Sequence, residues 1–171
     1  MSLITDFYND RGVCCSGHSR TQVLAFSDKE WNSNHVFIQW LFPSDQPSAF
    51  STTAPLLTEE DVFVFRSNMK IRYNVYASVQ RFMEFLGFQD PDCVQPFWWC
   101  DVDHNHLRIT RMLRFLKRCG FEDCIQDIKT RILTLDANFP DVVSNQTYLF
   151  WNEILFDEKM EPFPFLDLVI E

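Results

Sequence analysis

The stretch DHNHLRITRMLRFLKRCG, residues 103–120, predicts a helix that begins near Asp103 and ends at Cys119, just before Gly120. An α-helix turns by about 100° per residue, so its side chains can be sorted into stripes. One stripe is apolar and predicts a buried face: Ile109, Met112, Leu113 and Leu116. A second stripe, about 130° away around the helix, is mostly basic: His104, Arg108, Arg111, Phe115 and Arg118. The helix is therefore expected to pack through one face and to present cations beside it.

Helical spacing of apolar residues also dominates the rest of the chain, and alternation with a period of two is rare. The capping box SDKE, residues 27–30, predicts a helix from Ser27 through Gln39 to Leu41 that stops at Pro43. Further helices are predicted after the cap residue Thr58, over 71–86 with Gly87 following, over 121–136, and over 145–155 after the cap residue Ser144. Residues 88–100, which include PFWWC, are expected to form an irregular connection held by its rings.

We therefore expect an all-α fold, in which residues 1–171 form a single compact helical domain of five to seven helices with long aromatic-rich loops. An acidic tail is expected at 156–171. The chain has 18 Phe and 5 Trp but only 4 Gly, which predicts a core of large rings and argues against disorder.

The net charge and the absence of targeting segments limit the classes to which the protein can belong. A net charge of −9 opposes binding to nucleic acid, although the basic stripe leaves room for a local anion site. The sequence shows neither a secretion signal nor an apolar run long enough to span a bilayer, so no membrane insertion is expected. We expect a soluble intracellular protein, cytoplasmic or, in a eukaryote, also nuclear, whose six cysteines are free thiols.

Two groups of polar residues are candidates for a ligand-binding site. His35 and Gln39 lie one turn apart on the predicted helix 27–41, with Trp40 as an aromatic wall, and His104, Asn105, Arg108 and Arg111 lie on the helix 103–119. One interpretation is structural: the polar atoms satisfy each other between two helices, or the arginines pair with acids. The other is a pocket in which the two arginines bind a carboxylate or phosphate. Either way, His35, Gln39, Asn105 and Arg108 are predicted to converge.

Metal binding and catalysis have weaker support. Cys93, Cys100, His104 and His106 lie within fourteen residues, but the spacing C-x6-C-x3-H-x-H departs from zinc-site patterns, so neither a metal nor a cofactor is expected. The sequence contains no recognised catalytic motif. An enzyme of unrecognised type, with His35 or His104 as general base beside the two arginines, stays open as an alternative.

Four stretches of the chain resemble a known family. NHVFIQWLFP at 34–43, APLLTEEDVFVF at 54–65, FMEFLGF at 82–88 and HNHLRITRMLRFLKRCGFE at 104–122 occur in the order found in the opioid growth factor receptor family, so the resemblance covers 34–122. It implies a helical domain and, in animal members, an intracellular receptor for the peptide Met-enkephalin that restrains growth. Two features depart from the family pattern: the segment 88–103 is shorter and carries PFWWC, and the long low-complexity tail of animal members is absent.

The leading hypothesis is a non-enzymatic binding or regulatory domain for a peptide or another small carboxylate-bearing ligand. Besides the enzyme, a second alternative is a protein interaction module that works through exposed rings at Phe97–Trp99 or through the tail.

Overall fold

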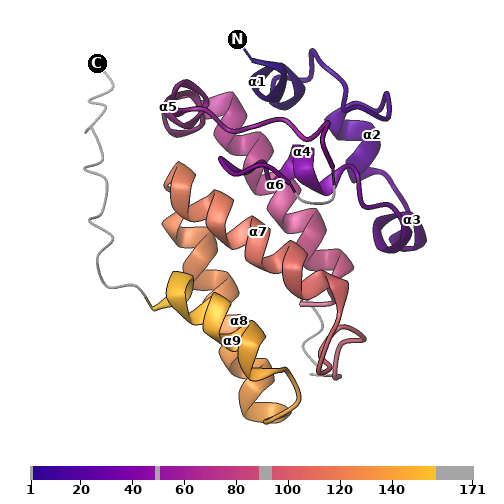
Figure 1. Cartoon of the computed structure of the whole chain (residues 1–171), viewed down its shortest axis with the longest axis vertical. Helices are drawn as coiled ribbons and strands as arrows, with labels where there is room; N and C mark the ends of the chain where they lie inside the picture. Colours follow the sequence, from indigo (N-terminus) through magenta and orange to yellow (C-terminus); the bar gives the residue numbers. More distant parts are fainter. Residues whose placement is uncertain (1, 49–50, 89–93, 157–171) are drawn as a thin grey trace.

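The computed structural model describes residues 2–48, 51–88 and 94–156 and is all-α, as predicted (Figure 1). Within these residues the only strand-like feature is an isolated bridge between Ser44 and Leu56. The predicted tail falls largely outside the described residues. The helices are α1 (Leu3–Tyr8), α2 (Arg20–Leu24), α3 (Asp28–Ser33), α4 (Ile38–Leu41), α5 (Glu59–Ser67), α6 (Met69–Phe85), α7 (His104–Cys119), α8 (Glu122–Asn138) and α9 (Asn145–Leu155).

Most of the predicted helix boundaries are confirmed, because they follow from local capping. Thr58 accepts a hydrogen bond from the Asp61 amide at 3.2 Å, and the Asp61 carboxylate accepts one from the Thr58 amide at 3.0 Å, which fixes the start of α5. Ser144 caps α9 by accepting a hydrogen bond from the amide of Thr147 at 3.3 Å. Gly120 ends α7 with a left-handed φ of 72°, a conformation that costs glycine little.

The prediction of one helix from Ser27 to Leu41 is wrong. The capping box is present, but α3 ends at Ser33 and α4 begins only at Ile38. Asn34 has extended backbone angles, and its side chain accepts a hydrogen bond from the Val36 amide at 3.0 Å, which closes a local turn in place of the helix. His35 and Gln39 therefore do not share a helix face.

The described helices also outnumber the expected five to seven. The two short helices α1 and α2 were not predicted, and the break at Asn34 adds another. Both short helices begin with a capping box, at Ser2 with Thr5 and at Ser19 with Gln22. At five or six residues they are too short to show a hydrophobic period, so their stability comes from packing.

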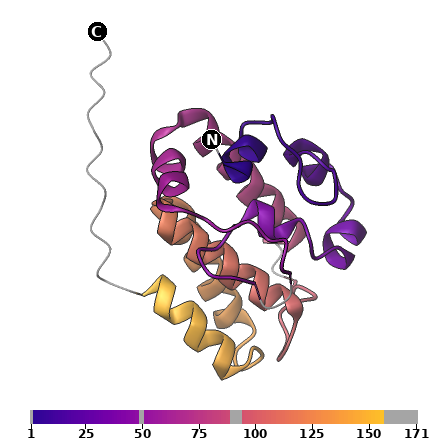
Figure 2. The same ribbon diagram turned by 45° about the horizontal axis from the view of Figure 1, so that its top comes forward.

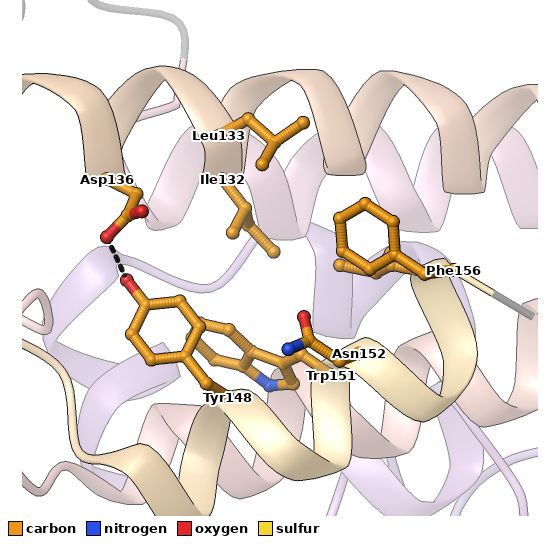
Figure 3. Close-up of a pocket in the computed structure, with 8 residues that line it drawn as sticks. Ile132, Leu133, Asp136, Tyr148, Trp151, Asn152 and Phe156 are labelled. Carbon is orange, nitrogen blue, oxygen red and sulfur yellow. Dashed lines mark hydrogen bonds between the residues drawn. The ribbon is translucent and has the colours of Figure 1, made fainter.

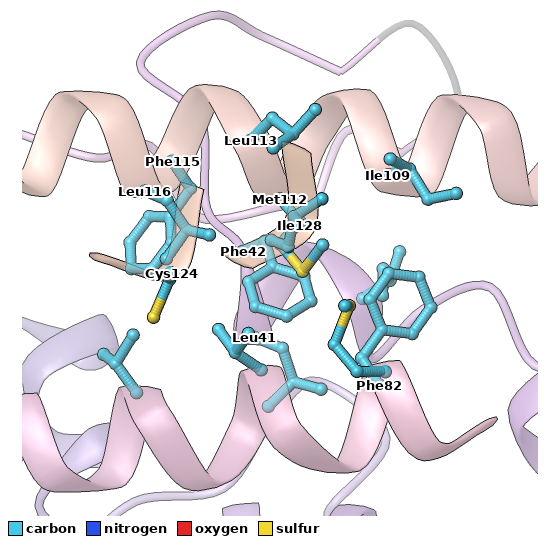
Figure 4. Packing of buried hydrophobic residues seen from close by; sticks show 14 of the residues in the cluster. Leu41, Phe42, Phe82, Ile109, Met112, Leu113, Phe115, Leu116, Cys124 and Ile128 are labelled. Atoms are coloured by element: carbon cyan, nitrogen blue, oxygen red, sulfur yellow. The ribbon is translucent and has the colours of Figure 1, made fainter. Parts of the chain in front are cut away.

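Helix α7 lies at the centre of the fold and contacts α5, α8 and α9. Figures 1 and 2 show α1–α4 gathered on one side of α6 and α7, with α8 and α9 on the other. The apolar stripe of α7 is fully buried, as predicted, and faces rings and methyl groups from α4, α6 and α8 (Figure 4): Leu41, Phe42, Phe82 and Ile128. One connected cluster of buried side chains includes residues from every described helix.

The described part of the connection before α7, residues 94–103, is irregular and held by its rings, as predicted, but most of these rings are not exposed. Trp98 and Trp99 are fully buried, and their indole N–H groups donate to Leu86 O at 2.7 Å and Phe139 O at 3.1 Å. Only Phe97 is exposed, and its ring also contacts Phe85. The interaction surface predicted for Phe97–Trp99 is therefore wrong for its two tryptophans. None of the described helices combines the length and apolar character needed to cross a bilayer.

Candidate functional site

Arg108 of α7 reaches across to the carboxyl end of α3. Its Nη1 donates to Trp31 O at 2.7 Å, and its Nη2 donates to Asn34 O at 3.0 Å and, more weakly, to Asn32 O at 3.5 Å. The last carbonyls of a helix lack partners within the helix and carry the negative end of its dipole. Arg108 thus supplies both hydrogen bonds and a positive charge where α3 ends.

The same guanidinium joins two of the other predicted site residues. Arg108 Nη2 donates to His35 Nδ1 at 3.0 Å, and Nη1 donates to Asn105 Oδ1 at 3.2 Å. Asn105 is fully buried, and its amide Nδ2 donates in turn to Asp103 Oδ1 at 2.8 Å. Because arginine has no acceptor, His35 Nδ1 must be unprotonated, so the neutral ring carries its proton on Nε2. His35, Asn105 and Arg108 therefore converge as predicted.

The two histidines of the site lie beside each other. The ring centroids of His35 and His104 are 5.3 Å apart in an edge-to-face arrangement, and both residues are exposed. Partial burial, followed by the charge of Arg108, lowers the pKa of both imidazoles below the ordinary value. Both rings are therefore neutral at pH 7.

Arg111 ends α4 as Arg108 ends α3. Its Nε donates to Phe42 O at 2.9 Å, directly after the last residue of α4. Burial lowers the pKa of this guanidinium. The terminal nitrogens of Arg111 have no hydrogen-bond partner among the described residues. We call the place where Arg108 and Arg111 meet the ends of α3 and α4, together with His35, His104 and Asn105, the arginine junction.

Neither arginine of the junction forms an ion pair with an acid in the part of the chain that the structure describes. The expectation that these two arginines pair with acids is therefore not met among the described residues, and the acid pairing on this stripe belongs to Arg118. Arg118 pairs with Glu59 at the start of α5 and lies 4.0 Å from Asp45. The basic stripe of α7 thus contacts three segments of the amino-terminal half: the end of α3 through Arg108, the end of α4 through Arg111 and the start of α5 through Arg118.

Gln39 and Trp40 lie in the core without a described hydrogen bond to the junction. Gln39 is buried, and its Nε2 donates to Ser48 Oγ at 3.1 Å. Trp40 packs edge-on against Phe7 of α1 at 5.7 Å between centroids. Its buried indole N–H has no hydrogen-bond partner among the described residues. The contacts of these two residues thus lead away from Arg108, because the break at Asn34 separates them from His35.

The four residues weighed as zinc ligands are only partly described. Cys93 lies outside the described residues. His106 is buried, with Nε2 at 2.8 Å from Trp98 O and Nδ1 at 3.4 Å from Thr147 Oγ1. Across residues 2–48, 51–88 and 94–156, no three His, Cys, Asp or Glu side chains are grouped so as to hold a metal ion.

A hollow that the sequence reasoning missed lies between α8 and α9 (Figure 3). It has a volume of about 210 Å³, and Asp136 and Tyr148 stand at one end of it. A second hollow of about 530 Å³ shares these two residues and extends to Asp101 and Asp141. The spacing of Tyr148, Trp151 and Leu155 along α9 was the available signal, because residues three or four apart line one face of a helix.

The comparisons with known proteins point to one family. The sequence profile of the "Opioid growth factor receptor (OGFr) conserved region" matches residues 20–95. The opioid growth factor receptor of Rattus norvegicus is 34% identical over 101 residues, and that of Homo sapiens is 32% identical over 103 residues. The opioid growth factor receptor-like protein 1 of Xenopus tropicalis is 28% identical over 101 residues.

These matches cover about half of this chain, 52% for the two receptors and 53% for the Xenopus protein. They span only 17%, 15% and 20% of the rat, human and Xenopus proteins, respectively. No solved structure matches the chain. Over residues 20–95 the chain is similar to the opioid growth factor receptor conserved region.

Proposed function

We propose that the chain is a non-enzymatic binding domain, and that the arginine junction takes up the carboxylate of a peptide or another small ligand. The relatives are named receptors for an opioid growth factor, so a peptide of this kind is the first candidate. An intracellular location belongs to the same proposal and rests on the family resemblance. The oligomeric state plays no part in it.

The observation that carries the proposal is the set of unused donors on Arg111. Its Nε is occupied by Phe42 O, but its terminal N–H groups have no partner among the described residues. A guanidinium already committed to an acid cannot be given to an incoming anion without breaking that pair, and Arg111 has no such acid partner in the described residues. Since Arg111 is only half-buried, a carboxylate can approach it.

The histidines add donors to the same surface. Because His35 Nδ1 accepts from Arg108, the neutral ring presents an N–H at Nε2. A neutral imidazole that keeps its proton on the free nitrogen is a donor for a carboxylate and a poor general base. This tautomer argues against the enzyme alternative with His35 as base and leaves His104 as the remaining candidate for that role.

The proposal is tested by calorimetric titration of the intact chain with Met-enkephalin in two forms, one with a free and one with an amidated carboxyl terminus. We expect the free acid to bind more tightly, and Arg111→Gln to weaken its binding by about tenfold or more, since a hydrogen bond to a charged group contributes about 1.5–3 kcal/mol. The matched control is Arg114→Gln, because Arg114 is exposed on the same helix and lies against Phe150 instead. Equal binding of the acid and the amide, or an equal loss in the control variant, contradicts the proposal.

A further inference from the structure

The two hollows beside α8 and α9 form a continuous surface with two chemical characters. The smaller hollow is lined mainly by apolar and aromatic side chains, among them Ile132, Trp151, Leu155 and Phe156 (Figure 3). The more open hollow is lined by three carboxylates, from Asp101, Asp136 and Asp141. Asp136 and Tyr148 belong to both and mark the point where the apolar part meets the acidic part.

No lysine or arginine among the described residues forms an ion pair with these carboxylates. None of the residues lining either hollow is lysine or arginine. One oxygen of Asp136, Oδ1, accepts the Tyr148 hydroxyl at 2.6 Å, while Oδ2 has no described hydrogen bond. Burial and the neighbouring carboxylates raise the pKa of Tyr148, so its hydroxyl stays protonated and remains the donor of this pair.

We propose that the two hollows together bind a small hydrophobic ammonium ion, with its charged nitrogen at Asp136 and its apolar group against Leu133, Tyr148 and Phe156. Carboxylates next to aromatic rings favour such a cation, through ion pairing and through the ring faces. A bare metal ion fits less well, because the described acids are not grouped closely enough to ligate one. This site is separate from the arginine junction and does not rest on the function proposed for it.

The size and the charges of the site fix the ligand and its direction. A volume of about 210 Å³ is below the range of about 300–1,000 Å³ typical of drug-sized ligands, so the apolar group should be one ring or a short alkyl chain. Lys129 Nζ lies 4.1 Å from the centroid of the Phe156 ring and would repel an ammonium there. Asp136 stands at the opposite end of the hollow from Phe156 (Figure 3). The ammonium group therefore points toward Asp136.

The test uses 2-phenylethylammonium as the probe and the uncharged 2-phenylethanol as its isosteric control. Each is titrated into the intact chain labelled with ¹⁵N, and amide shifts are followed by NMR. We expect saturable shifts confined to α8, α9 and the loop between them for the amine, with an affinity at least about tenfold above that of the alcohol. Asp136→Asn should reduce the affinity for the amine about tenfold, and added salt should weaken binding.

Two further variants keep the result interpretable. Glu153→Gln removes the same charge from an exposed position on α9 that lines neither hollow, and it should bind the amine like the parent chain. Asp141 has a left-handed φ of 59°, which asparagine tolerates, so Asp141→Asn tests the acidic hollow without backbone strain even if Asp136→Asn fails to fold. Asp141→Asn should also weaken the binding of the amine. Absence of saturable shifts at α8 and α9, equal binding of amine and alcohol, or unchanged binding by both aspartate variants overturns the proposal.

Discussion

Replacing Arg108 by methionine should destabilise the fold by about 2–4 kcal/mol. The change leaves two buried acceptors without a partner, Trp31 O and Asn105 Oδ1. Each stranded acceptor costs about 1–3 kcal/mol, which gives a gross loss of about 2–6 kcal/mol. Water can replace the guanidinium at Asn34 O and at His35, which are more exposed. Burial lowers the pKa of Arg108 to about 10, so removing the charge also relieves a desolvation cost and brings the net effect below the gross one.

The measurement is urea unfolding followed by tryptophan fluorescence, with Arg108→Lys and Arg114→Met beside it. Lysine keeps the charge but cannot contact both Trp31 O and Asn34 O in the planar geometry of a guanidinium, so it should recover less than half of the loss. Arg114 is exposed, and its replacement should change the free energy of unfolding by less than about 0.5 kcal/mol. If Arg108→Met stays within about 0.5 kcal/mol of the parent, the capping of α3 by α7 is not a source of stability and the reasoning fails.

Three further outcomes follow from the described contacts. The fold lowers the pKa of His35 and His104 below 6.5. At pH values just below 6.5 the unfolded chain therefore binds more protons than the folded chain. The midpoint of thermal unfolding should fall as the pH drops through this range. Replacing both histidines by glutamine should flatten this dependence, and an unchanged pH slope argues against it. Gly120→Ala should lower the free energy of unfolding, measured in urea, by about 1 kcal/mol, because φ is 72° at this position. Steric crowding is not the cause, since the new methyl group would meet only Arg66 atoms at 3.7 Å and beyond. A neutral effect would mean that the helix end relaxes. Burial raises the pKa of the Cys119 thiol to about 12, whereas Cys15 is exposed, so mass spectrometry after brief alkylation should find Cys15 modified and Cys119 protected, and equal labelling would contradict the packing of α7.

The parts of the fold that the sequence predicts correctly are those set by neighbouring residues. Thr58, Ser144 and Gly120 mark helix ends through groups within a few positions of themselves, so the start of α5 and both ends of α7 and α9 were predicted nearly correctly. The break after Ser33 has one local sign, because the Asn34 side chain accepts a hydrogen bond from the Val36 amide. The carbonyl groups at the end of α3 are instead taken by Arg108, 74 to 77 residues further along the chain, and no local pattern encodes that contact.

The candidate site was predictable to the same extent. The convergence of His35, Asn105 and Arg108 followed from the need of buried polar atoms for partners. The position of Gln39 away from this group could not be predicted, because it depends on the break after Ser33. The bonds of the arginines to backbone carbonyls were not predicted, because the expected partners were a ligand, an acid or the polar side chains of a facing helix. Backbone carbonyls at helix ends are a third kind of partner, and the sequence gives no sign of where they will be presented.

The arginine junction also ties the segment that the profile matches to a helix that lies beyond it in the chain. The profile match stops at residue 95. Two helices inside it are terminated by donors from α7. The Trp31 carbonyl is bonded by Arg108, 77 residues further along the chain, and the Phe42 carbonyl by Arg111, 69 residues further along. A nascent chain that has emerged only to residue 95 would carry the whole matched segment without the groups that hold its first helices in place. The first helices of the matched segment would then gain these contacts late, once α7 arrives, because contacts between such distant positions form slowly. An excised copy of residues 20–95 would lack both arginines.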